Sequence, residues 1–129
     1  MAQSFDPAAY AVLVVEDDAL LRAEAVDLCE EAGFTVYEAR DADQAIRELE
    51  RHSEIRVLFT DIEMPGSMDG LKLARAVRDR WPPVAIIVTS GRVNPGEGDI
   101  PERGVFFAKP YPPQSIVDTL TGIAAEIRS

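Results

Sequence analysis

The 129-residue sequence is poor in the residues that build disulfides, zinc sites and nucleic-acid surfaces. Its single cysteine, Cys29, cannot form a disulfide within the chain, and its single histidine, His52, has no cysteine or second histidine nearby in sequence. Lysine and arginine number 13 against 23 aspartate and glutamate, which gives a net charge of −10. This shortage of positive charge argues against nucleic acid or an anionic membrane as a main partner, because both require a basic surface. We therefore expect a soluble cytoplasmic protein that binds cations or a basic protein surface.

Long apolar runs are also absent from the sequence. No stretch approaches the roughly 20 apolar residues of a membrane span, and the first residues lack the basic and then apolar pattern of a secretion signal. A chain of 129 residues is long enough to bury one core but not two. We expect a lead-in over residues 1–9, followed by one domain over residues 10–129.

Five short segments have the composition of β-strands. Four are continuously apolar, which is typical of strands covered on both faces: residues 10–15, 57–60, 84–89 and 105–108. The fifth segment, residues 35–39, alternates between apolar and polar positions, which indicates an edge strand.

Apolar residues at helical spacing fill most of the gaps between these strands. The predicted helices cover residues 19–32, 41–51, 69–81 and 116–127, with Leu21 among the inward positions of the first. Alternating strands and helices predict a parallel sheet with helices on both faces. Residues 91–104 interrupt this alternation, since four Gly and two Pro within 14 residues disfavour a regular helix and leave a turn or a short distorted helix.

Polar side chains follow four of the five predicted strands at the point where each strand ends. They are Glu16, Asp17 and Asp18 after the first strand, Asp61 after the third, Thr89 and Ser90 at the end of the fourth, and Lys109 after the fifth. The carboxyl ends of parallel strands lie at one edge of the sheet, where α/β proteins build their sites. We interpret Asp18 as the cap of the following helix and expect the other residues to form one site.

Electrostatics suggests the chemistry of this site. Carboxylates about 4 Å apart repel by about 4 kcal/mol per pair at an effective dielectric constant near 20, so either their pKa values rise or a cation lies between them. Carboxylate oxygens without clustered His or Cys favour Mg²⁺ or Mn²⁺ as that cation. With the amine of Lys109 and the hydroxyl of Thr89, the set has what phosphoryl transfer to an aspartate requires. Asp61 is the expected nucleophile, because it stands alone at the tip of a central strand.

Four motifs at these strand ends resemble the receiver domain of two-component response regulators, including stand-alone receivers of the chemotaxis-regulator type. They are VLVV followed by Glu16 and Asp17, DIEMPGSMDG beginning at Asp61, IIVTSG around Thr89, and FFAKPY around Lys109. The resemblance extends over residues 10–127. It implies a flavodoxin-like, doubly wound α/β fold with a five-stranded parallel sheet in the order 2-1-3-4-5. The fourth helix of that fold, between the fourth and fifth strands, would be shortened or irregular here.

The resemblance also implies a role for the acidic residues. Asp61 would accept a phosphoryl group from a histidine kinase or a phosphotransfer protein. The ligands of Mg²⁺, or of Mn²⁺ in its place, would be Glu16, Asp17, Asp61 and the backbone carbonyl of Glu63.

The remaining residues would act on the phosphoryl group and respond to it. Thr89 and Lys109 would stabilise its oxygens, the Lys109–Pro110 peptide bond would be cis, and Thr89 and Phe106 would form a conformational switch. The implied partners besides the phosphodonor are an unidentified downstream protein and also a second copy of the chain. Nucleic acid and membrane are not implied, nor is an enzymatic activity beyond assistance to its own phosphotransfer and dephosphorylation.

Three features depart from the common receiver pattern. Ser67 lengthens the loop after Asp61 by one residue, and we expect a bulge there. Phe106 lacks the hydroxyl of the tyrosine often found at this position in the family. Residues 91–104 replace the usual fourth helix, which belongs to the output face of many relatives.

Two other functions stay open at this point. The chain would be a phosphatase with an aspartate nucleophile if Glu63, two residues after Asp61, took the place of the usual general-acid Asp. It would be a binding module alone if Asp61 were never phosphorylated.

Overall fold

The sheet has the architecture that the sequence predicts. The computed structural model describes residues 10–128 except 67 and 97, so the expected lead-in over residues 1–9 and the expected bulge at Ser67 lie outside the described residues. The described elements are β1 (Ala11–Val15), α1 (Ala19–Glu31), β2 (Thr35–Ala39), α2 (Ala42–Arg51), β3 (Ile55–Asp61), α3 (Gly70–Arg80), β4 (Ala85–Ser90), β5 (Val105–Ala108) and α4 (Pro113–Arg128). All strand pairs are parallel, in the order β2-β1-β3-β4-β5. The flavodoxin-like fold is therefore confirmed.

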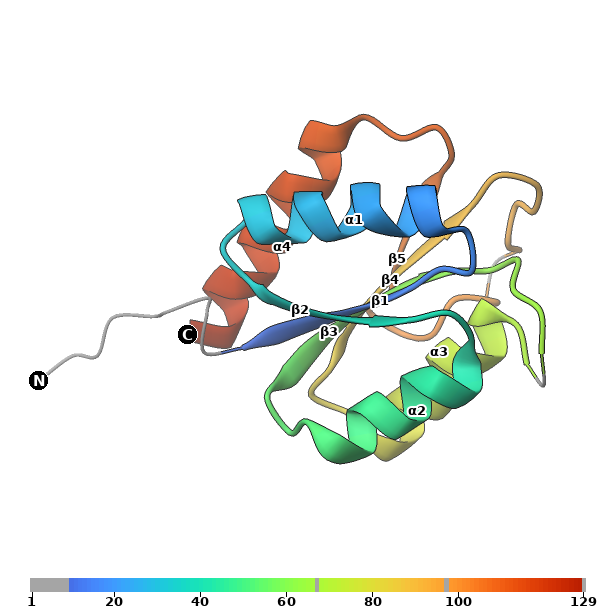
Figure 1. Cartoon of the computed structure of the whole chain (residues 1–129), viewed down its shortest axis with the longest axis horizontal. Coiled ribbons are helices and arrows are strands. Elements are labelled where there is room, and N and C mark those ends of the chain that lie inside the picture. Colours follow the sequence, from blue (N-terminus) through green and yellow to red (C-terminus); the bar gives the residue numbers. More distant parts are fainter. Residues whose placement is uncertain (1–9, 67, 97, 129) are drawn as a thin grey trace, which may run out of the picture.

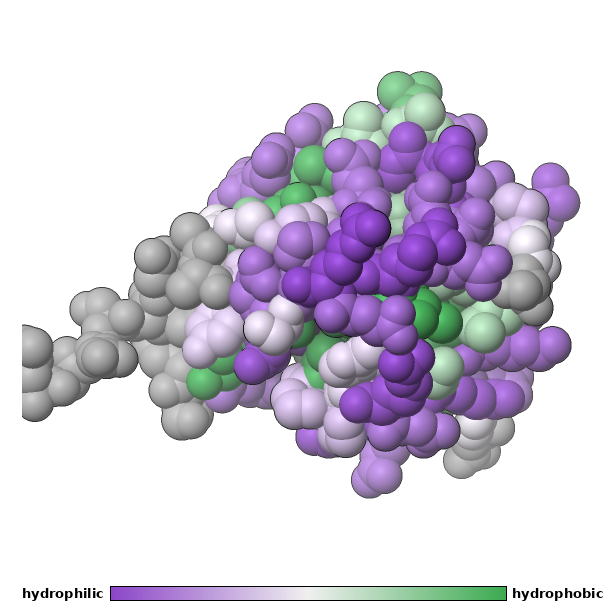
Figure 2. Space-filling model, turned by 60° about the horizontal axis from the view of Figure 1, so that its bottom comes forward, coloured by the Kyte–Doolittle hydropathy of each residue, from purple (hydrophilic) through white to green (hydrophobic). Residues whose placement is uncertain are grey.

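Helices cover both faces of the sheet, with α1 and α4 on one side and α2 and α3 on the other (Figure 1). Side chains of a strand alternate between the two faces, so β1 sends Val12 and Val14 toward α1 and α4, and Leu13 and Val15 toward α2 and α3. This double burial explains why β1 reads as a continuous apolar run. The outer surface on the α2–α3 side is largely hydrophilic, with small separate hydrophobic areas (Figure 2).

The two edge strands, β2 and β5, differ in how closely their burial follows their sequence patterns. The alternating strand β2 lies at one edge, as predicted. The apolar strand β5 lies at the other edge, where Val105 is 37% exposed and the adjacent Phe106 and Phe107 are half-buried. The expected cover of β5 on both faces is therefore present only in part: Phe106 packs against the core on the α2–α3 side and Phe107 on the α1–α4 side, while Val105 and Ala108 are exposed.

Aspartate side chains cap the first three helices, including the predicted cap Asp18. The carboxylates of Asp18, Asp41 and Asp69 accept hydrogen bonds from backbone N–H groups in the first turns of α1, α2 and α3. Leu21 was expected to point inward, but its side chain is 39% exposed. It lines a surface cavity beside the first turn of α1 instead of packing under the helix.

No helix joins β4 to β5 in the described part of residues 91–104. This segment is held against the body near its middle, where the Arg75 Nη2 atom of α3 donates to the Asp99 backbone carbonyl at 3.3 Å and Ile100 packs against the core. The fourth described helix, α4, therefore follows β5 and does not lie between β4 and β5. Across the described residues, the structure contains no helix that combines the length and the apolar character of a membrane span.

Gly70, the first residue of α3, fixes the contact between this helix and the end of β3. Its backbone N–H donates to the Ile62 carbonyl at 2.9 Å, and a Cβ atom at this position would overlap the Asp61 carbonyl group. The missing side chain therefore lets α3 lie directly against the backbone of Asp61.

We predict that Gly70→Ala destabilises the protein by about 2 to 4 kcal/mol, because the added methyl group meets backbone that cannot rotate away. Gly122→Ala, in α4, is the matched control, since no atom lies within 4 Å of a Cβ there. That variant should be neutral or slightly more stable, as alanine favours a helix. Urea unfolding of both variants measures the difference, and equal stability of the two would contradict the proposed contact.

Candidate functional site

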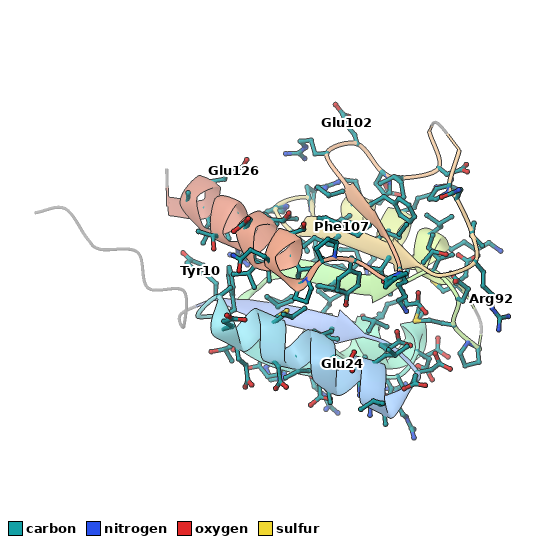
Figure 3. The ribbon with its side chains drawn as sticks, turned by 90° about the horizontal axis from the view of Figure 1, so that it is seen from above. Tyr10, Glu24, Arg92, Glu102, Phe107 and Glu126 are labelled. Carbon is teal, nitrogen blue, oxygen red and sulfur yellow. The ribbon has the colours of Figure 1, made fainter. Side chains whose placement is uncertain are left out.

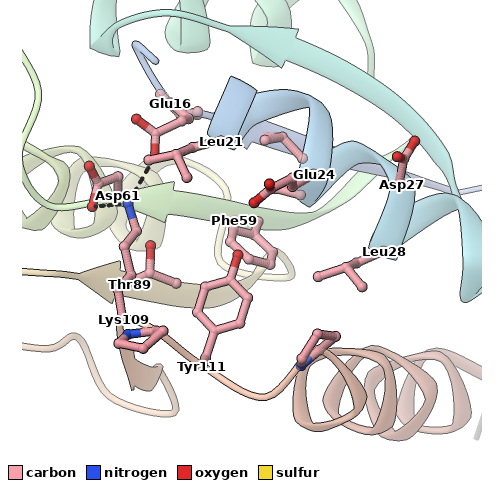
Figure 4. A pocket seen from close by; sticks show the side chains of 15 residues that line it. Glu16, Leu21, Glu24, Asp27, Leu28, Phe59, Asp61, Thr89, Lys109 and Tyr111 are labelled. Carbon is pink, nitrogen blue, oxygen red and sulfur yellow. Dashed lines mark hydrogen bonds and ion pairs between the residues drawn. The ribbon is translucent and has the colours of Figure 1, made fainter. Parts of the chain in front are cut away.

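The ammonium group of Lys109 lies between two carboxylates at the carboxyl edge of the sheet. Its Nζ atom is 2.9 Å from Glu16 Oε1 and 3.2 Å from Asp61 Oδ1 (Figure 4). The Glu16 and Asp61 side chains are only 8% and 7% exposed. The three residues follow β1, end β3 and follow β5, so this interaction joins three strand ends that are distant in sequence.

The backbone around Asp61 is fixed by its neighbours. The Ile62 N–H donates to the Thr89 carbonyl at 2.8 Å, which extends the pairing of β3 and β4 beyond Asp61. The Thr60 hydroxyl donates to the Asp61 backbone carbonyl at 3.0 Å. The Asp61 carboxylate is less satisfied, because its Oδ1 atom is buried and, despite the ion pair with Lys109, accepts no hydrogen bond from the described residues. A buried acceptor of this kind is open to an additional ligand.

Glu16, Asp17 and Asp61 form an acidic cluster that could hold a metal ion. Each offers a carboxylate oxygen, and these oxygens lie within 4.8 Å of one another. Asp17 is exposed to solvent, whereas Glu16 and Asp61 are buried. An all-oxygen donor set, with an Asp61 oxygen whose one printed partner is the ion pair with Lys109, fits a small hard cation such as Mg²⁺ or Mn²⁺.

The electrostatic environment changes the proton affinity of the two central groups. Burial raises the pKa of Asp61 to about 6, and the nearby charges of Glu16 and Glu63 add to this effect while Lys109 opposes it. Burial alone would lower the pKa of Lys109. The hydrogen bond to Glu16 and the charge of Asp61 outweigh that effect and raise this pKa above its ordinary value.

Of the other predicted site residues, some lie at the cavity beside Asp61 and others lie away from it. Thr89 is buried and lines the same cavity as Asp61 and Lys109, and the Lys109–Pro110 peptide bond is cis. Phe106 lies apart from this cavity and packs against the core on the α2–α3 side of the sheet. The Glu63 side chain also points elsewhere, since its carboxylate accepts hydrogen bonds from residues 90–92.

A cavity of about 630 Å³ opens beside the ion pair and runs along α1. Leu21 and Leu28 of α1 line it from one side and Tyr111 from the other, with the Phe59 ring at its base (Figure 4). The Tyr111 ring packs edge-on against Phe59 at 6.3 Å between centroids. The cavity therefore offers an apolar wall directly adjoining Asp61.

Sequence reasoning missed one residue that positions the acidic cluster. Arg22 in α1 donates from Nη1 to the Glu16 backbone carbonyl at 2.9 Å and from Nε to Glu38 Oε1 at 3.0 Å. It therefore holds the loop after β1 and brings positive charge to it. No local pattern marks Arg22, because one of its partners lies in the loop after β1 and the other on β2.

Comparison with known proteins gives a consistent result over most of the chain. A family model described as the response regulator receiver domain matches residues 12–121. The hydrogenase transcriptional regulatory protein HoxA of Cupriavidus necator is 30% identical over 114 residues, which cover 85% of this chain and 23% of that protein. The nitrogen assimilation regulatory protein NtrX of Azorhizobium caulinodans is 31% identical over 87 residues, covering 67% of this chain and 19% of that protein. The chain thus spans less than a quarter of the length of either relative.

Solved structures include close matches to the fold. A response regulator receiver protein from Sinorhizobium medicae has a TM-score of 0.82 to this chain, covering 94% of it and 98% of the solved chain. At 24% sequence identity this likeness bears on the fold alone.

The raised pKa of Asp61 predicts that stability falls as pH rises through the slightly acidic range. The folded protein keeps a proton on Asp61 up to a pH of about 6, whereas the unfolded chain releases it near 3.8. The folded state therefore binds more protons between these values, so the free energy of unfolding falls as pH rises through them. Asparagine does not ionise, so Asp61→Asn should not lose stability in this way. Its free energy of unfolding should exceed that of the unmodified protein by on the order of 1 to 2 kcal/mol at about pH 7.5.

Urea unfolding in metal-free buffer at several pH values measures this difference. The advantage of Asp61→Asn should shrink as the pH falls from about 6 toward about 4, because the folded unmodified protein then keeps its proton on Asp61. Asp79→Asn, at an exposed position of α3, is the control and should show no such trend. A stability difference that does not change with pH would contradict the assignment.

Proposed function

The chain belongs to the response regulator receiver family, and on that premise we propose that it is a phosphoacceptor switch in a two-component or phosphorelay pathway, with residues 10–129 as its receiver domain. The observation that carries the proposal is the buried carboxylate of Asp61, which ends a central strand beside the amine of Lys109. A nucleophile and the cation that stabilises its product are thus in contact before any substrate binds. The cavity along α1 gives a phosphodonor access to the same carboxylate.

In the proposed reaction, a carboxylate oxygen of Asp61 attacks the phosphorus of a phosphohistidine. The new bond joins oxygen to phosphorus, the phosphorus–nitrogen bond breaks, and the imidazole nitrogen leaves with the electron pair. Lys109 pairs with the phosphoryl oxygens, and the buried Thr89 hydroxyl donates to one of them. Thr89 and Phe106 would then form the conformational switch, and any coupling between them would depend on packing alone, since Phe106 has no hydroxyl.

The acidic cluster serves in this proposal as a Mg²⁺ site, which Mn²⁺ also fits. Three carboxylates against one ammonium group leave two negative charges when all are ionised, and a divalent cation balances them. Glu16, Asp17 and Asp61 would hold the ion through oxygen, together with the backbone carbonyl of Glu63. The bound ion supplies charge neutralisation for the phosphoryl oxygens as the aspartate approaches. Arg22 keeps the loop that carries Glu16 and Asp17 in place.

The partners follow from the surfaces beside the site. A histidine kinase or phosphotransfer protein would dock near the exposed Leu20 and Leu21, which lie at the start of α1 next to the cavity. A downstream protein, or a second copy of the chain, would contact the outer surface of α4 and residues 91–104.

We propose a cytoplasmic location, since the protein would meet both its phosphodonor and its target there. We also propose that it has no enzymatic activity beyond assistance to its own phosphorylation and dephosphorylation.

The two other functions have less support. A phosphatase of the aspartate-nucleophile class would require a free acid two residues after Asp61. The Glu63 carboxylate is instead engaged by three hydrogen bonds from residues 90–92. A binding module that is never phosphorylated would not require the carboxylate of Asp61, which is costly to bury and lies in contact with Lys109.

The proposal predicts that acetyl phosphate and Mg²⁺ convert the protein to a form heavier by one phosphoryl group. Intact mass spectrometry detects the adduct, which should be labile to base as acyl phosphates are. Asp61→Asn should form none, whereas the matched carboxylate variant Asp79→Asn on α3 should form it as the unmodified protein does. Chelation of Mg²⁺ by EDTA should suppress the adduct.

Other outcomes would favour the other functions. A binding module would give no adduct under any condition. A phosphatase would release inorganic phosphate continuously from unrelated phosphomonoesters, with turnover lost in Asp61→Asn.

A further inference from the structure

The Glu63 carboxylate ties the loop after β3 to the turn after β4. Glu63 Oε2 accepts a hydrogen bond from the Ser90 hydroxyl at 2.7 Å. Glu63 Oε1 accepts from the backbone N–H groups of Gly91 and Arg92, each at 3.0 Å. We name residues 90–93 the β4 exit turn. A carboxylate that binds three donors is a strong local constraint, because hydrogen bonds to a charged acceptor are stronger than neutral ones.

The β4 exit turn is itself closed by the side chain of Ser90. Its Oγ atom accepts from the Arg92 N–H at 3.2 Å and from the Val93 N–H at 2.8 Å, while its own proton goes to Glu63. Every residue of the turn is therefore held, directly or through Ser90, by Glu63. Figure 3 shows where this turn lies: Arg92 is at the carboxyl end of the sheet, opposite the end marked by Tyr10.

The position of Glu63 places this link between the two central groups of the site. Glu63 is two residues after Asp61, and the turn it holds begins directly after Thr89. Both side chains carry carboxylates, so Glu63 bears a charge of the same sign as Asp61. The side chain that holds the backbone next to Thr89 therefore comes from the loop that directly follows Asp61.

We propose that Glu63 is a positioning residue that holds the β4 exit turn while Asp61 is unphosphorylated and loosens its hold when Asp61 is phosphorylated. The inference rests on the proposed function and adds its conformational step. Phosphorylation changes the charge at Asp61 from −1 to roughly −2, which increases its repulsion of the Glu63 carboxylate. The Glu63 carboxylate then moves toward solvent, and its hydrogen-bond donors in the turn lose their acceptor.

Loosening of the β4 exit turn would also affect residues 91–104, which replace the fourth helix usual in this family. Residues 91–104 begin at the β4 exit turn, and their next anchor in the described residues is the contact of Asp99 with Arg75. Loosening of the turn changes the placement of Val93, which is 42% exposed beside it. Phosphorylation at Asp61 is thereby converted into a change of surface at the start of this segment.

Amide hydrogen exchange of Gly91 and Arg92, measured by NMR, tests the proposal. Exchange is compared in the metal-free protein, with Mg²⁺ alone, and with Mg²⁺ under a sustained excess of acetyl phosphate. In the unmodified protein, phosphorylation should accelerate both amides by about tenfold relative to Mg²⁺ alone. Glu63→Ala should accelerate them by a similar factor without phosphorylation, and phosphorylation should then add little.

Two variants separate charge repulsion from simple filling of space. Glu63→Gln keeps the length of the side chain and one acceptor oxygen but carries no charge, so phosphorylation should leave its exchange rates unchanged. A role of Glu63 in packing alone would give the same response to phosphorylation in Glu63→Gln as in the unmodified protein. Glu50→Gln, at an exposed residue of α2 paired with Arg80, is the control and should behave as the unmodified protein does.

Three results would overturn the inference. One is a phosphoryl adduct on Asp61 with no change at Gly91 and Arg92, which leaves the proposed function intact. Another is protection of both amides in Glu63→Ala at the level of the unmodified protein, which would show that the turn does not depend on Glu63. This measurement is made without phosphorylation. The third is the absence of any adduct, which overturns the proposed function and the release step with it.

Discussion

The balance between clustered carboxylates and one ammonium group is the constraint on which the rest of this structure depends. Glu16 and Asp61 are almost fully buried and would repel each other strongly without Lys109 between them. Because each residue stands at the end of a different strand, this contact specifies how β1, β3 and β5 terminate relative to one another. The same balance leaves excess negative charge and a buried oxygen without a hydrogen bond, in a cluster of carboxylates that could hold a metal ion.

Around this centre, hydrogen bonds connect Asp61 and the loop that follows it to the neighbouring elements. The Asp61 backbone is paired to β4 through Ile62 and Thr89, and lies directly against α3 at Gly70. Glu63 then extends the contact to the turn after β4. A chain without a helix between β4 and β5 in its described residues therefore retains hydrogen bonds that join the loop after Asp61 to residues 90–93.

The fold and the centre of the site could be predicted from the sequence, because both follow from strong regularities. Buried parallel strands read as short apolar runs, and parallel topology brings Glu16, Asp61 and Lys109 to one edge. The sequence could not give the direction of the Glu63 side chain, which depends on the path of the loop after β3. Nor could it give the exposure of Leu21, which faces a cavity, or the partial exposure of β5, whose composition is that of a covered strand.

The identity of the phosphorylated residue is measured most directly by chemical trapping. Borohydride reduces an acyl phosphate on an aspartate to the alcohol, so the modified residue becomes homoserine and can be located by peptide mass spectrometry. After treatment with acetyl phosphate and Mg²⁺, homoserine should be found at position 61 and only in the phosphorylated sample. Homoserine at Asp17 or at another aspartate, or an adduct that leaves Asp61 unreduced, would contradict the central role assigned to Asp61.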